Sequence, residues 1–160
     1  MKLHHRLAAL LFMCCLVIAS TTRGFEIVPA DDGGVAGQTL TVQGEVVSMT
    51  LLGGSSGFDN QIAPPNAAPG AALSCRTLPA GFTASLGRFD ARTELALTLT
   101  TPEGDVWTMG PAVDNDDLVP HARLSATAPD TVLVEWEDLN GGGDADYNDC
   151  RVELRITPAR

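Results

Sequence analysis

The stretch TVLVEWEDLNGGGDADYNDCRVELRIT, residues 131–157, places two alternating segments around an acidic centre. Alternation of apolar and polar residues is the period of a β-strand with one buried face. We therefore expect antiparallel strands over 131–137 and 150–157, joined by a loop. The residues expected to face the core are Val132, Val134, Trp136, Cys150, Val152, Leu154 and Ile156. Glu135 and Glu137 fall on the opposite, outward face by the same alternation.

The acidic centre, residues 137–149, is called the acidic loop below. It holds five acids, two Asn and three consecutive Gly, and it contains no Lys or Arg. Carboxylates at this density repel one another unless a cation lies among them. Because hard oxygen ligands suit Ca²⁺, the sequence predicts a calcium site, with Tyr147 as a packing anchor for the loop. The expected ligands are Glu137, Asp138, Asp144, Asp146, Asn148 and Asp149.

The spacing of three of these ligands is similar to part of an EF-hand. Asp144, Asp146 and Asn148 occupy alternate positions, as in the first half of an EF-hand loop. The sixth position is Asp149 where that loop has Gly, and the twelfth is Arg155 where it has Glu. We therefore expect a cation loop that is not an EF-hand. The competing interpretation is a solvated acidic turn held by its own Asx-turns.

A second polar cluster comprises Asp114, Asn115, Asp116 and Asp117. Its composition fits an exposed turn, a second cation site, or a segment that folds against the acidic loop and shares its ion. Zinc is not expected at either place, because zinc prefers Cys and His ligands and His121 is the sole His beyond the N-terminal segment.

The N-terminus has the pattern of a targeting segment. Basic residues Lys2 and Arg6 precede an apolar run over 7–19 that is too short to span a membrane, and small residues follow it. We predict a signal peptide over 1–23 and a single domain over 24–160, in a secreted, periplasmic or extracellular protein without membrane insertion. If cleavage follows Ser20, the loss of Lys2 and Arg6 changes the net charge from −10 to −12, which disfavours nucleic acid as a partner.

Two cysteines remain after the predicted signal peptide, Cys75 and Cys150. In an exported chain, an even pair favours a disulfide, which would stabilise the fold by about 4 kcal/mol. The alternative is two buried thiols, because Cys is small and apolar.

Short alternating segments separated by turn residues fill the rest of the chain and predict an all-β protein, an antiparallel β-sandwich of jelly-roll-like type. Residues 38–52 are expected to form one long strand that bends near Gly44, where the apolar phase changes. The prolines of 53–72 argue against a central strand there. Residues 93–101 form the clearest strand, and Ala126 is expected to face inward.

Residues 136–149, WEDLNGGGDADYND, resemble the signature of a bacterial secreted-protein family, domain of unknown function 4114. Its members carry Phe-Glu-Asp-Leu, Gly-Gly-Gly-Asp and Asp-Tyr-Asn-Asp near the end of a β-rich domain. A looser likeness within 109–122 extends the resemblance over 90–157. Trp136 stands where Phe is usual, and Cys150 stands where a branched apolar residue is usual. The resemblance implies an exported, surface or adhesin-like protein without established enzymatic activity, in which calcium binding is inferred.

Three functions are compatible with these features. The first is an exported non-enzymatic β-sandwich whose acidic loop binds Ca²⁺, structural or adhesion-like, with a glycan or a surface protein as partner. The second is a carbohydrate-binding module, which needs an exposed aromatic residue such as Trp107. The third is a two-carboxylate hydrolase using Glu135 and Glu137, although these can equally pair with Arg151 and Arg155 across the hairpin.

Overall fold

The computed structural model is all-β, and this confirms the fold class expected from alternation. No helix among the described residues is both long and apolar enough to cross a membrane. Most of the predicted signal peptide lies outside the described residues, apart from strand β1 (Thr21–Thr22). The structure describes residues 21–22, 24–29, 37–43, 46–64, 67 and 72–157.

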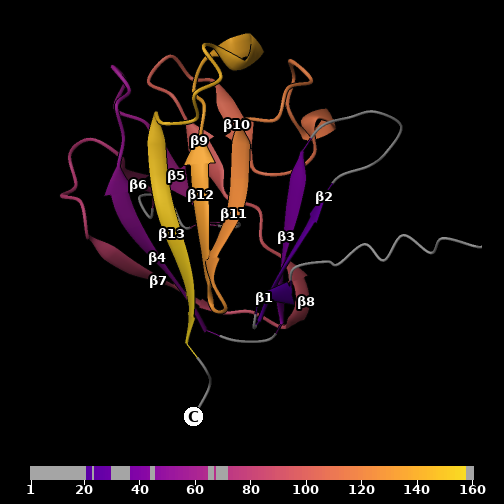
Figure 1. Ribbon diagram of the computed structural model, residues 1–160. Coiled ribbons are helices and arrows are strands. Elements are labelled where there is room, and N and C mark those ends of the chain that lie inside the picture. The colour runs from indigo at the N-terminus through magenta and orange to yellow at the C-terminus, as the bar shows by residue number, and fades with distance from the viewer. Residues whose placement is uncertain are drawn as a thin grey trace, which may run out of the picture.

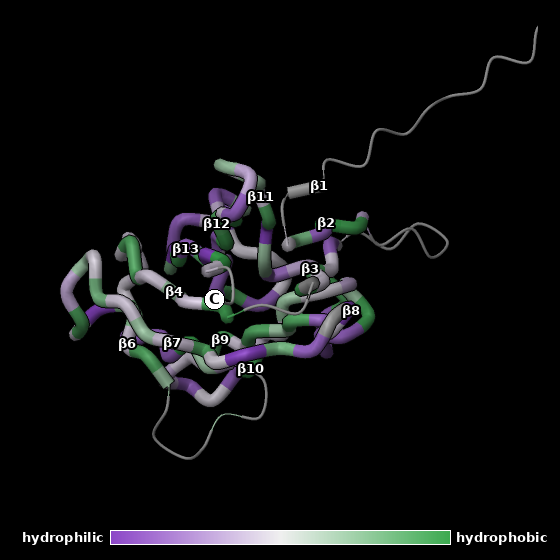
Figure 2. The backbone as a smooth tube through the Cα atoms, turned by 90° about the horizontal axis from the view of Figure 1, so that it is seen from below, coloured by the Kyte–Doolittle hydropathy of each residue, from purple (hydrophilic) through white to green (hydrophobic). Residues whose placement is uncertain are grey.

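The strands form three antiparallel sheets (Figure 1). The five-stranded sheet contains, in spatial order, β11 (Ala122–Ala128), β12 (Thr131–Trp136), β13 (Cys150–Thr157), β4 (Val46–Gly53) and β7 (Thr83–Arg88). The second sheet contains β10 (Val106–Thr108), β9 (Thr98–Thr100), β5 (Gln61–Ala63) and β6 (Leu73–Ser74). The third contains β1, β2 (Phe25–Pro29), β3 (Gln38–Gln43) and β8 (Ala91–Glu94). Figure 2 shows β2, β3 and β8 on one side of the molecule and β11, β12, β13 and β4 on the other.

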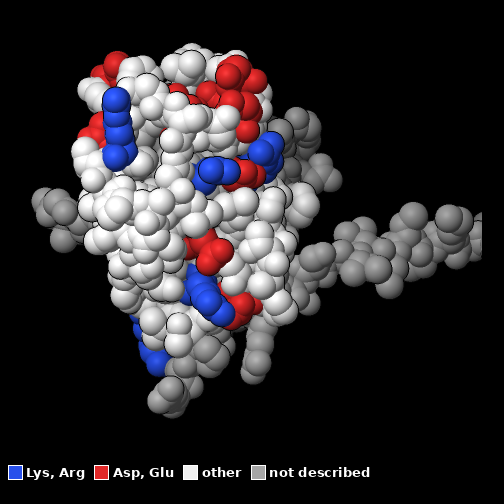
Figure 3. Space-filling model, turned by 60° about the vertical axis from the view of Figure 1, so that its left-hand side comes forward, with Lys and Arg blue, Asp and Glu red and all other residues white. Residues whose placement is uncertain are grey.

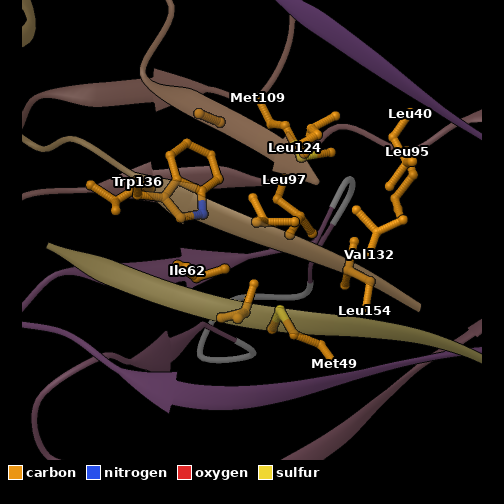
Figure 4. Close-up of a cluster of buried hydrophobic side chains, with 14 of the residues drawn as sticks. Leu40, Met49, Ile62, Leu95, Leu97, Met109, Leu124, Val132, Trp136 and Leu154 are labelled. Carbon is orange, nitrogen blue, oxygen red and sulfur yellow. The ribbon is translucent and has the colours of Figure 1, made fainter. Parts of the chain in front are cut away.

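One hydrophobic core joins the three sheets (Figure 4). Trp136 of β12 is fully buried, and it lies in the same cluster as Ile62 of β5 and Leu40 of β3. Burying one large apolar side chain contributes roughly 1.5–3 kcal/mol, so this shared cluster is the main force that holds the sheets together. The alternating faces of β12 and β13 are buried as expected, from Val132 to Trp136 and from Cys150 to Ile156.

Two expected strands are each divided between sheets. Residues 38–52 form β3 and β4, which belong to different sheets, so the change of apolar phase marks a change of sheet and not a bulge within one strand. Residues 93–101 likewise contribute to β8 and β9. Leu95, Leu97 and Leu99 are all fully buried, so the buried face predicted from alternation is confirmed. The prediction that these residues form one continuous strand was wrong.

Two further expectations were wrong. Strand β5 lies inside the proline-containing segment 53–72 and pairs on both edges, with β6 and with β9. The hydrogen bonds of β5 to its two neighbours are not interrupted, because Pro64 lies just after the strand and is not required to donate one. Ala126 is exposed, because the register of β11 against β12 shifts between Ala126 and Ala128, at the end of an edge strand.

Cys75 and Cys150 form the disulfide that the sequence favoured, with their Cα atoms 5.8 Å apart. The bond joins the segment after β6 to the first residue of β13, and so links two sheets beside the end of the acidic loop. The amide of Cys75 also donates to the carbonyl of Asn60 at 2.8 Å.

Removing the disulfide is expected to destabilise the fold, because the bond restricts the unfolded chain over a sequence separation of 75. In the chain-entropy treatment this contributes about 4 kcal/mol. The double variant Cys75→Ala/Cys150→Ala should therefore unfold at a lower urea concentration, with a loss of about that size in the free energy of unfolding. Natural protein treated with reductant serves as the control, and an unchanged midpoint in both samples would contradict the expectation.

Candidate metal centre

The acidic loop lies at one end of the molecule, where β12 and β13 meet (Figure 1). Figure 3 shows acidic side chains gathered at the same end. Trp136 pairs with Cys150 at the base of the loop, and the Asp149 amide donates to the Trp136 carbonyl at 3.1 Å. The loop therefore starts and ends on two strands that the core holds in fixed register.

The glycine run folds the loop back over its own first residue. Residues 141–143 have positive φ angles of 74°, 78° and 44°, which glycine adopts readily. A Cβ at Gly143 would lie only 2.2 Å from Oε1 of Glu137, so only glycine leaves room for that carboxylate. Ala145 and Tyr147 also have positive φ, an uncommon conformation for residues with a side chain. The backbone is thus shaped around Glu137.

Glu137 is the centre of the site, although alternation placed it on the outward face. Its side chain is 1% exposed, and neither carboxylate oxygen has a hydrogen-bond partner among the described residues. Because β12 ends at Trp136, the alternation of the strand does not extend to Glu137. An ionised carboxylate buried in this way is costly unless a cation compensates it.

Two groups of carboxylates share Glu137. In each group, one oxygen from every residue lies within 4.8 Å of the others. This is twice the usual Ca²⁺–oxygen distance of about 2.4 Å, so each set of oxygens can surround one ion. The outer group consists of Glu137, Asp144 and Asp146. The inner group consists of Glu137, Asp138 and Asp149.

Asn148 lies beside the outer group and holds its shape. The Asp146 amide donates to Asp144 Oδ1 at 3.4 Å, and the Asn148 amide donates to Asp146 Oδ1 at 2.9 Å. The side-chain amide of Asn148 also donates to Asp146, and its own Oδ1 is buried without a partner. The sequence offered Asx-turns and converging carboxylates as alternatives. The acidic loop contains both.

Residues 53–60, called the supporting segment below, hold the inner group from outside the acidic loop. Ser56 Oγ donates to Oδ2 of Asp138, and Nδ2 of Asn60 donates to the same oxygen at 2.6 Å. The Ser55 amide donates to the Asn148 carbonyl at 2.9 Å. The sequence did not identify Ser56 or Asn60 as part of the site, and its only signal was the polar run GGSSGFDN within a long loop.

The inner group has the most perturbed acid. The pKa of Asp149 is raised to about 7: burial is the main cause and the charges of Asp138 and Glu137 add to it, against the 3.0 Å hydrogen bond donated by the Asp138 amide. Burial also raises the pKa of Glu137; the Leu139 amide and the Asp149 side chain oppose the rise, while the charges of Asp144 and Asp138 add to it. Without a cation Asp149 therefore stays partly protonated near neutral pH, whereas a cation would displace its proton.

The second polar cluster meets the acidic loop through one residue. Asp117 Oδ2 accepts a 2.7 Å hydrogen bond from the Gly141 amide and lies 2.9 Å from Nε2 of His121. Burial raises the pKa of Asp117, but these hydrogen bonds outweigh it and the pKa is lowered. Asn115 is buried and bonds the backbone of Thr108 and Val119. The cluster thus folds against the loop, and neither carboxylate group includes its residues Asp114, Asp116 or Asp117.

Trp107 and His121 form a stacked pair behind the site, with ring centroids 3.8 Å apart. Trp107 Nε1 donates to the Asp138 carbonyl at 2.8 Å, and His121 Nδ1 lies 2.8 Å from the Glu137 carbonyl. Both contacts fix the backbone at the beginning of the loop. Trp107 is only 3% exposed, so the expectation that it stacks on a sugar at the surface was wrong: its ring packs on His121 instead.

Tyr147 and Glu135 have structural partners. The Tyr147 hydroxyl donates to the Pro120 carbonyl at 3.0 Å, and Arg123 lies 4.8 Å from the centre of its ring, which suits an anchor for the loop. Arg123 also pairs with Glu135 at 3.1 Å. The expected pairing of Glu135 with an arginine of β13 is therefore replaced by a pair across β11 and β12. Strand β12 has a neighbour on each edge, and Arg123 of β11 lies opposite Glu135 just as Arg151 of β13 does.

Comparison of the chain with models of protein families, with curated proteins and with solved structures finds no match. The resemblance of residues 136–149 to the secreted-protein family therefore stays a prediction.

Without metal ions, the protein is expected to be less stable at pH 8 than at pH 5. Asp149 keeps its proton up to about pH 7 when folded, whereas in the unfolded chain it loses the proton near 3.8. The folded state binds more protons across this window, so raising the pH favours unfolding. Melting temperatures in chelator should fall from pH 5 to pH 8.

The matched control is Asp149→Asn, which has nearly the same shape and can still accept from the Asp138 amide. It removes the titrating group, so its melting temperature should fall less steeply over the same pH range. An equally steep fall in the variant would show that Asp149 is not the source.

Proposed function

We propose that this is an exported, non-enzymatic β-sandwich whose acidic loop binds Ca²⁺, and whose ion-stabilised end makes structural or adhesion-like contacts with a glycan or a surface protein. The observation that carries the proposal is the carboxylate of Glu137. It is buried, has no hydrogen-bond partner of good geometry within the described part of the chain, and lies within both carboxylate groups. A cation accounts for all three properties.

The donor chemistry favours calcium over other metals. Every member of the two groups offers oxygen, and Ca²⁺ takes six to eight oxygen ligands in irregular geometry. Mg²⁺ demands near-ideal octahedral geometry and usually keeps several water ligands, so it depends less on a cluster of protein carboxylates. Zinc prefers Cys and His, and both nitrogens of His121 already face the Glu137 carbonyl and Asp117.

A hydrolase is supported less well than a cation-binding domain. The two carboxylates that the sequence offered have separate surroundings: Glu135 pairs with Arg123, whereas Glu137 is buried in the loop. His121 stacks on Trp107 and is fully buried, which suits a structural role.

Export is supported by two features. The N-terminal segment has a basic start and a short apolar run, as secretory signals do. The Cys75–Cys150 bond suits an oxidising compartment, where disulfides form and persist. The resemblance to a family of secreted bacterial proteins points the same way, and calcium in such surroundings is abundant enough to fill a site of modest affinity.

Calcium is expected to raise the melting temperature of the natural protein, because a ligand that binds only the folded state stabilises it by mass action. At ten times the dissociation constant the gain is about 1.4 kcal/mol, or a few degrees for a chain of this size. Differential scanning calorimetry in calcium and in chelator measures the shift.

The variant Glu137→Gln should lose this shift, since an amide cannot replace the shared carboxylate. Glu135→Gln is the matched control, two residues earlier in the chain and outside both groups, and it should keep the shift. A natural protein whose melting temperature is the same in calcium and in chelator would contradict the proposal.

A further inference from the structure

We infer that the acidic loop holds two cations, an inner and an outer one, bridged by the carboxylate of Glu137. This inference rests on the proposed calcium binding and specifies its stoichiometry and its ligands. The inner ion lies among Glu137, Asp138 and Asp149, and the outer ion lies among Glu137, Asp144 and Asp146.

The grouping of the oxygens supports two positions. Asp138 and Asp149 belong only to the inner group, and Asp144 and Asp146 belong only to the outer group. Glu137 alone belongs to both, and neither of its oxygens has a hydrogen bond of good geometry from the residues that the structure describes. A carboxylate with two free oxygens can bind one ion with each of them, which is how paired metal ions about 3.5–4 Å apart are commonly bridged.

The charge of the loop also favours more than one ion. Its five carboxylates are those of Glu137, Asp138, Asp144, Asp146 and Asp149, and the loop has no Lys or Arg. One divalent cation would leave three negative charges, whereas two would leave a single one. At short separations in a partly buried site, repulsion among three unbalanced charges is considerable.

The inner position is prepared by the supporting segment. Oδ2 of Asp138 is occupied by Ser56 and Asn60, and Oδ2 of Asp149 accepts from the Asp138 amide. These hydrogen bonds fix the orientation of both carboxylates beside the inner position. Oδ1 of Asn60, fully buried and without a partner, is a further acceptor beside this group. Outer-shell hydrogen bonds of this kind orient ligands before the metal arrives.

The two positions differ in their contact with water. Asp138 is buried and Asp149 is half-buried, whereas Asp144 and Asp146 are exposed. The outer ion can keep several water ligands, so we expect it to bind more weakly than the inner ion. A pocket of about 250 Å³ lies beside the inner group, and its lining includes Ser56, Cys75 and Asp149.

Equilibrium dialysis against calcium, with the bound metal measured by atomic absorption, tests the inference. The natural protein should bind two calcium ions per chain. Asp144→Asn/Asp146→Asn should bind one, with the tighter affinity, and Asp149→Asn should bind one, with the weaker affinity. Glu137→Gln should lose at least tenfold in affinity at both positions, and Glu135→Gln should match the natural protein. Circular dichroism and urea midpoints establish that each variant is folded. Because Asp144 and Asp146 are exposed, substituting them is expected to leave the packing of the core unchanged.

The outcomes separate this inference from the proposal beneath it. One ion per natural chain, lost equally in both sets of variants, would overturn the two-ion arrangement and leave calcium binding intact. Two ions that persist unchanged in folded Glu137→Gln would overturn the bridge. Absence of bound calcium in the natural protein would overturn both the inference and the proposed function.

Discussion

The burial of the Glu137 carboxylate, without a hydrogen-bond partner of good geometry among the residues that the structure describes, is the constraint on which the site depends. Folding brings this group to the end of β12 because Trp136, its neighbour, is held in the core. The positive φ and missing side chain of Gly143 bring the loop directly against it. Hydrophobic burial thus holds together carboxylates that repel one another, and a cation bound among them would convert that repulsion into attraction.

The scaffold around this carboxylate is rigid because several independent contacts hold its backbone. Trp107 and His121 stack on each other and fix the carbonyls of the first two loop residues. On the opposite side, the Cys75–Cys150 bond ties the first residue of β13 to a segment whose amide bonds Asn60. Asn60 in turn orients Asp138. A site held in this way loses little conformational entropy when an ion binds, which favours affinity.

Local patterns in the sequence predicted the features that depend on local chemistry. Alternation identified the buried faces of β12 and β13, the crowding of acids identified the loop, and the even pair of cysteines identified the disulfide. The features that were missed depend on contacts between distant segments. Alternation cannot say to which sheet a strand belongs, so the changes of sheet within 38–52 and 93–101 were not foreseen. Ser56 and Asn60 reach Asp138 from 82 and 78 residues away, and no local pattern marks such a contact.

The most direct measurement is a crystal structure of the natural protein grown in calcium, with an anomalous difference map calculated around Glu137. The structure leads us to expect a peak about 2.3–2.6 Å from the carboxylate oxygens of Glu137, surrounded by oxygens of the neighbouring Asp residues. A map without such a peak, in which both Glu137 oxygens accept hydrogen bonds from protein or water, would contradict the cation site.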